Sequence, residues 1–137
     1  MFAEDLIYLF ERGNIGVYGR TLFKGSKARI PAGPGPFTSV IETGGSKAEG
    51  THNDGPQAYI HPSAQLVFRA EEYDVARAKA RDAYSLLSGV MNQFVNGTWW
   101  RDVTIVQEPF DLQEDEVGRA RVVFNIDVTM RQSPAAS

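Results

Sequence analysis

Apolar residues at helical spacing predict two helices. The longer one covers residues 71–88, where apolar side chains recur every three or four positions and Gly89 follows as a stop signal. Its apolar stripe consists of Tyr73, Ala76, Ala80, Ala83, Tyr84 and Leu87. The shorter helix runs from Asp5 to Arg12, with acidic residues in its first turn and a basic residue in its last. Because alanine is small, the longer helix can lie close against a sheet.

Alternation of apolar and polar residues, together with β-branched content, predicts the strands. They are residues 21–25, 37–43, 64–70, 98–107 and 119–130. In the last of these, one face carries Ala120, Val122, Phe124, Ile126 and Val128, and the residues between them point to the other face. This pattern predicts a half-exposed strand of the kind that pairs in an antiparallel sheet.

The connecting segments have turn and loop compositions. Residues 31–36 contain three prolines and predict a bend between strands, and the Asn96–Gly97 dipeptide predicts a tight turn. Residues 44–56 form the longest irregular stretch and are rich in glycine. Residues 111–118 form an acidic loop. The closing residues 132–137 have nothing to bury and are expected to be flexible.

These elements together predict an α+β fold built on a single mixed, mostly antiparallel β-sheet that is flanked by two α-helices. The chain has 137 residues, which is the usual size of one domain. We therefore expect one domain over residues 1–131, followed by a flexible C-terminal tail over residues 132–137.

Composition narrows the class of protein. The chain contains no cysteine, which excludes disulfides, thiol catalysis and cysteine-based metal sites. Its formal net charge of -3 argues against a general nucleic-acid binder. No signal peptide and no apolar stretch long enough to cross a bilayer are recognisable. We therefore expect synthesis in a cytoplasm and no membrane partner.

The motifs of common chemistry are incomplete, so we expect neither an enzyme nor a cofactor. The glycine-rich loop lacks P-loop spacing, the acidic loop lacks the glycine and glutamate of a calcium loop, and no serine lies in a nucleophile elbow. His52 and His61, with Glu49 and Asp54 nearby, could supply metal ligands. A small metal- or ligand-binding enzyme domain that uses these histidines is therefore the alternative from another functional class.

The Trp99–Trp100 pair points to an interaction surface. Adjacent residues on a strand face opposite ways, so one indole can enter the core while the other meets solvent, a helix or a partner. Tryptophan is enriched at the energetic centres of protein interfaces. The alternative is that both indoles are partly buried within the domain.

Two stretches carry a family resemblance. The first runs from Ile41 to Gly45 and continues from Glu49 to Asn53; the second holds Glu108 to Leu112, Asp115, Gly118–Arg119 and Phe124 to Val128. In both, the chain resembles the tail terminator (tail-completion) and minor capsid proteins of long-tailed bacteriophages. These motifs are structural and contain no catalytic group.

The resemblance implies a virion protein that forms a homohexameric ring at the head-proximal end of the tail tube. Such a ring would stop tube growth, bind the tail tube protein and the head-completion (neck) protein, and let DNA pass without specific binding. Another neck or minor capsid connector is the nearest alternative. The candidate contact residues are Trp99, Trp100, Phe110, Asp111, Glu114, Asp115, Glu116, Lys47, Glu49 and His52.

Overall fold

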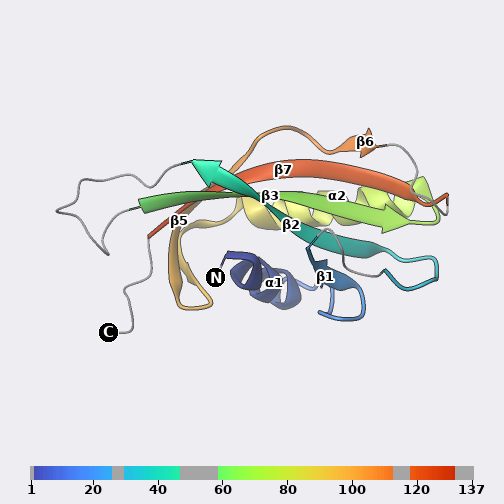
Figure 1. The fold of residues 1–137 in the computed structure, drawn as a ribbon, viewed down its shortest axis with the longest axis horizontal. Coiled ribbons are helices and arrows are strands. Elements are labelled where there is room, and N and C mark those ends of the chain that lie inside the picture. The colour runs from blue at the N-terminus through green and yellow to red at the C-terminus, as the bar shows by residue number, and fades with distance from the viewer. Residues whose placement is uncertain (1, 26–29, 47–58, 113–117, 132–137) are drawn as a thin grey trace.

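The computed structural model describes residues 2–25, 30–46, 59–112 and 118–131 (Figure 1). The helices are α1 (Phe2–Arg12) and α2 (Tyr73–Ser88). The strands are β1 (Leu22–Lys24), β2 (Phe37–Ser46), β3 (Tyr59–Ala70), β4 (Met91–Val95), β5 (Thr98–Ile105), β6 (Phe110–Leu112) and β7 (Ala120–Arg131). Most of the predicted loop over residues 44–56 and the predicted tail over residues 132–137 lie outside the described residues.

The strands form one seven-stranded sheet. Its order is β1-β2-β3-β7-β5-β4, and β6 pairs with β7 beside this path. Among the described strands, only β1 and β2 pair in parallel, and the other neighbours are antiparallel. The predicted α+β fold with a mixed, mostly antiparallel sheet and two helices is therefore confirmed.

Both helices pack on the same face of this sheet. The predicted stripe of α2 supplies Ala76, Ala80, Ala83 and Leu87, which are all fully buried. They belong to one apolar cluster that also contains buried residues of α1 and the inward residues of β3 and β7. At its centre the rings of Phe68 and Phe124 stack with centroids 5.6 Å apart. The small alanines allow α2 to approach the sheet closely, as the sequence predicts.

The other face of the sheet carries a smaller apolar cluster that the alternating pattern did not predict. Val123 lies on the face of β7 that the sequence predicts to be exposed, yet it is fully buried. Its cross-strand neighbours are Val67 of β3 and Phe110 of β6. Phe37 is also buried, and its ring lies 6.3 Å from that of Phe23. The prediction that this face of β7 is exposed is therefore wrong at Val123, because β6 pairs with β7 there and Phe110 lies beside Val123.

Several strand boundaries differ from the prediction. β2 continues through Gly44 to Ser46, so the irregular stretch begins later than expected. β3 begins at Tyr59 and contains Pro62. The ladder between β3 and β7 skips His61 and Pro62, which fits a residue that has no N–H to donate. β4 and β6 were not predicted, because β4 shows no alternating apolar pattern and the alternation of β6 covers only three residues.

Candidate assembly surface

The β4–β5 hairpin forms one edge of the sheet. Its turn is Asn96–Gly97, with positive φ values of 51° and 86°, as a two-residue hairpin turn of this hand requires. β5 pairs with β7, while β4 is the terminal strand and pairs only with β5 among the described strands. The turn dipeptide was predicted from sequence. The same dipeptide could also have indicated β4, the strand that was not predicted, because a hairpin turn needs a strand on each side.

The two tryptophans of β5 point to opposite faces. Trp100 is fully buried, and its ring centroid lies 5.9 Å from that of Phe2 in α1. Trp99 is half-buried on the other face, where Phe94 of β4 meets it edge-on at 5.0 Å. Strand alternation predicts this split. Trp100 is consequently a core residue and offers no surface to a partner, whereas Trp99 remains a candidate contact.

Apolar and basic side chains cluster around Trp99. Met91 and Phe94 are 66% and 67% exposed, which is unusual for such large apolar groups. The guanidinium of Arg131 lies 5.9 Å from the centroid of the Trp99 ring, and Arg101 lies 5.6 Å from that of Tyr59. We call Met91, Phe94, Trp99, Arg101 and Arg131 the hairpin patch. Aromatic and arginine side chains in this combination are typical of protein interfaces.

A second exposed surface lies around β6. Val106, Phe110 and Leu112 are large exposed apolar residues, and Glu108 is exposed between them. Asp111 is also exposed, but it pairs with the inward residue Val122 and so lies on the other face of the sheet from Phe110 and Leu112. We call Val106, Glu108, Phe110 and Leu112 the β6 patch. The segment is fixed to β7, because the Val106 N–H donates to the carbonyl of Asn125 at 2.9 Å and β6 pairs with residues 121–123. Phe110 and Asp111, both predicted contact residues, therefore lie at the surface.

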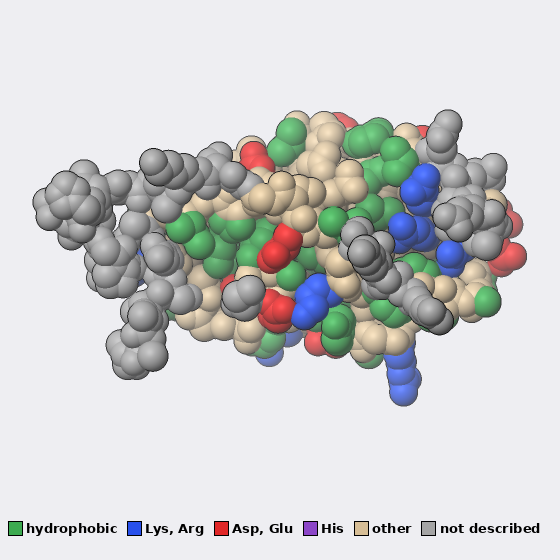
Figure 2. Space-filling view, in the orientation of Figure 1, with side chains coloured by type: hydrophobic (Ala, Val, Ile, Leu, Met, Phe, Trp, Pro, Cys, Tyr) green, Lys and Arg blue, Asp and Glu red, His purple; other side chains and the backbone are tan. Residues whose placement is uncertain are grey.

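In the ribbon, β5 lies toward one end of the long axis of the molecule and β6 toward the other (Figure 1). On the face drawn in Figure 2, hydrophobic side chains alternate with separate groups of acidic and basic ones. The remaining predicted contact residues, which are Lys47, Glu49, His52, Glu114, Asp115 and Glu116, lie outside the described residues.

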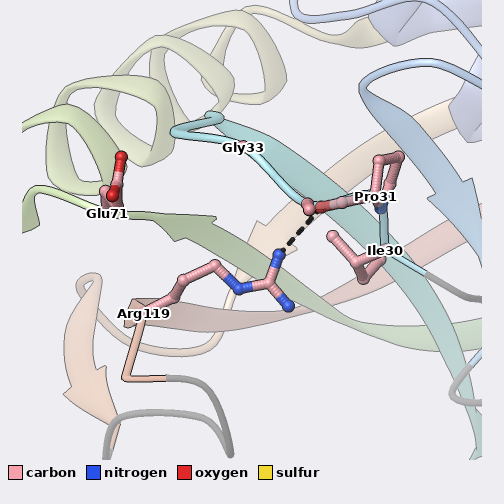
Figure 3. A pocket seen from close by; sticks show the side chains of 6 residues that line it. Ile30, Pro31, Gly33, Glu71 and Arg119 are labelled. Atoms are coloured by element: carbon pink, nitrogen blue, oxygen red, sulfur yellow. Dashed lines mark hydrogen bonds between the residues drawn. The ribbon is translucent and has the colours of Figure 1, made fainter.

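An open pocket of about 310 Å³ lies between the proline-rich bend and the start of β7 (Figure 3). Its lining includes Ile30, Pro31, Glu71 and Arg119. Arg119 donates from Nη1 to the Pro31 carbonyl at 3.2 Å, and its guanidinium lies 6.0 Å from the Phe37 ring. These contacts hold the bend over the smaller apolar cluster. Among the described residues, the lining contains no nucleophile paired with a base.

The described residues offer little material for a metal site. No group of three or more histidine and acidic side chains within them is placed to hold a metal ion. His61 lies in β3 with Nδ1 3.2 Å from Oγ1 of Thr129, and His52 lies outside the described part of the chain. None of the described helices combines the length and apolar character needed to cross a membrane.

A buried carboxylate links α1 to the hairpin. Asp5 is only 1% exposed, and Asn96 of the hairpin turn donates from Nδ2 to its Oδ1 at 3.2 Å. Burial raises the pKa of Asp5, and the hydrogen bond from the Asn96 side chain opposes this shift. The folded protein therefore holds the Asp5 proton more tightly than the unfolded chain does.

This environment predicts a pH-dependent effect of Asp5→Asn. The contribution of Asp5 to stability is fully present below the ordinary aspartate pKa of about 3.9, and it is lost as pH rises through the higher folded pKa. The free energy of unfolding of the wild type, minus that of Asp5→Asn, should therefore decrease from pH 3.5 to pH 7. Urea unfolding at each pH measures this difference. An increase with pH would mean that the fold prefers the charged carboxylate.

Comparison with known proteins agrees with this structural account. The profile of a family described as "Bacteriophage tail terminator protein" matches residues 11–132. No curated protein sequence matches the chain. A chain of the solved structure titled "Virion of native gene transfer agent (GTA) particle" is similar to it, with a TM-score of 0.55 and 12% identity over 82% of this chain and 80% of that one. That likeness shows a shared fold. Because the family profile spans nearly the whole sequence, this chain belongs to the bacteriophage tail terminator family and is a structural protein of the phage tail.

Proposed function

We propose that copies of this chain assemble into a homohexameric ring at the head-proximal end of the tail tube. In this role the ring ends growth of the tube by binding the tail tube protein. It then presents a surface to the head-completion (neck) protein, and DNA passes through it without specific contacts. The protein acts through its surfaces and catalyses no reaction.

The family membership is the observation that carries this proposal. The described surface supports it, because two exposed apolar patches lie on strands at the sheet edge. Monomeric proteins rarely leave such edges uncovered, since unpaired strands and exposed aromatic side chains promote association. Two patches on one chain also suit a ring, in which every subunit contacts two neighbours.

Native mass spectrometry over a range of protein concentrations tests the self-assembly. The expected species has six times the mass of the 15.1 kDa chain, either alone or when tail tube protein is added. A chain that stays monomeric under both conditions contradicts the ring. Binding to neck proteins without any binding to tube ends would instead indicate a connector elsewhere in the neck.

A further inference from the structure

We infer that the sheet face opposite the helices holds, beside the hairpin, a binding site for carboxylate groups of a partner protein. The site consists of Tyr59, Trp99, Arg101 and Arg131, which we call the arginine site. It lies on the face of the sheet, so the strand edges remain available to neighbouring copies in the proposed ring. The inference therefore does not rest on the ring.

Pairing across three strands brings these four side chains together. Tyr59 of β3 lies opposite Arg131 of β7, and Trp99 of β5 lies on the other side of Arg131. The guanidinium of Arg131 is 5.9 Å from the centroid of the Trp99 ring, and that of Arg101 is 5.6 Å from the centroid of the Tyr59 ring. Aromatic rings attract cations and restrict a planar guanidinium. Both cationic groups are therefore held in place before a partner binds.

Neither guanidinium is neutralised by the described part of the chain. No described carboxylate forms an ion pair with Arg101 or Arg131, and neither side chain donates a hydrogen bond to a described residue. The Nε of Arg131 is buried and has no hydrogen-bond partner. Of the acidic residues on this face, Asp102 follows Arg101 without pairing to it, and Asp127 accepts a hydrogen bond from Ser63. Guanidinium groups with such unused donors fit carboxylate oxygens, which they bind through parallel hydrogen bonds.

The apolar neighbours of the site indicate a protein segment rather than a nucleic acid. The rings of Phe94 and Trp99 meet at 71°, so they form a corner and not the parallel surfaces on which successive bases stack. Met91 and Phe94 leave this corner exposed. An apolar side chain fits such a corner, and carboxylates beside it complement the two arginines. The expected occupant is a segment of a partner protein that carries acidic residues next to apolar ones.

Peptide binding tests the arginine site. The probe is a short labelled peptide that alternates aspartate and leucine, and fluorescence anisotropy measures its affinity for the whole chain. Arg101→Gln and Arg131→Gln should each weaken binding by roughly tenfold, as the loss of one charge-assisted contact does. The matched control is Arg12→Gln, because Arg12 lies 5.4 Å from the centroid of the Tyr8 ring but belongs to α1. This control should leave the affinity unchanged, and thermal melting verifies that each variant folds.

Three further probes identify the occupant. A peptide with asparagine in place of aspartate should bind at least about tenfold more weakly. Equal binding of the two peptides, or arginine variants that bind like the wild type, would overturn the site. Tighter binding of a single-stranded oligonucleotide would assign the site to nucleic acid instead. Deletion of residues 132–137 should not raise the affinity for the peptide, and a large increase would make that segment the occupant.

Sedimentation velocity separates this inference from the proposed function. Arg101→Gln and Arg131→Gln should leave self-association unchanged, whereas Phe94→Ser on the edge strand β4 should weaken it. Loss of the oligomer in the arginine variants would mean that a second copy occupies the site, which overturns the inference and leaves the ring. A wild-type chain that binds the acidic peptide but never self-associates would contradict the ring alone.

Discussion

Trp100→Ala should lower the free energy of unfolding by about 3–5 kcal/mol, the usual cost of truncating a large buried aromatic residue. Trp100 is fully buried, and it joins the sheet to Phe2 of α1. Its loss leaves a cavity where helix, hairpin and sheet meet. A loss of this size is a large part of the stability of a small domain. Urea or thermal unfolding measures it.

Trp99→Ala is the matched control, since the same side chain is removed one position away. Trp99 is half-buried and contacts Phe94 and Arg131 on the other face of the sheet. We expect this variant to lose only about 1 kcal/mol of stability. It should weaken binding at the hairpin patch instead. Equal losses of stability in the two variants would contradict the assignment of one indole to the core and the other to the surface.

Ala80→Leu should destabilise the fold by about 1–3 kcal/mol, because extra methylenes must fit into a closely packed space. Ala80 is fully buried in the stripe of α2 that faces the sheet. Ala78 lies on the same helix and is exposed, so Ala78→Leu adds the same atoms without crowding. That control should change stability by no more than about 0.5 kcal/mol.

Chemical unfolding of the two leucine variants gives a direct comparison. If Ala80→Leu is as stable as Ala78→Leu, then α2 does not depend on small residues to approach the sheet.

The helices and the long strands were predictable because their burial follows local periodicity. The α2 stripe shows this, since Ala76, Ala80 and Ala83 are all buried as their spacing predicts. The opposite directions of Trp99 and Trp100 follow from the same rule for strands. These features depend on neighbours in sequence, and a single chain carries that information.

The edge strands were not predictable in the same way. β4 has no alternating pattern, because Met91 and Phe94 face solvent, and β6 alternates over only three residues, too few to predict a strand. Pairing across the sheet defines them, and pairing depends on residues distant in sequence. The burial of Val123 was missed for this reason, because it requires β6 to lie beside β7. The hairpin patch likewise combines Arg131 with Phe94, which no local pattern connects.

Of the predicted contact residues, the structure places Trp99, Phe110 and Asp111 at least partly at the surface and Trp100 in the core. The patches add Met91, Phe94 and Arg101, which composition alone does not distinguish from other residues. Their role depends on exposure, and exposure follows from the fold.

Tail length in the phage tests the central claim most directly. Tails should be measured by electron microscopy after deletion of this protein and after complementation with the wild type or with Phe94→Ser. The account predicts that deletion gives tails of no defined length without attached heads, that the wild type restores uniform tails, and that Phe94→Ser restores them poorly. Tails of normal length that are joined to heads in the absence of the protein would contradict it.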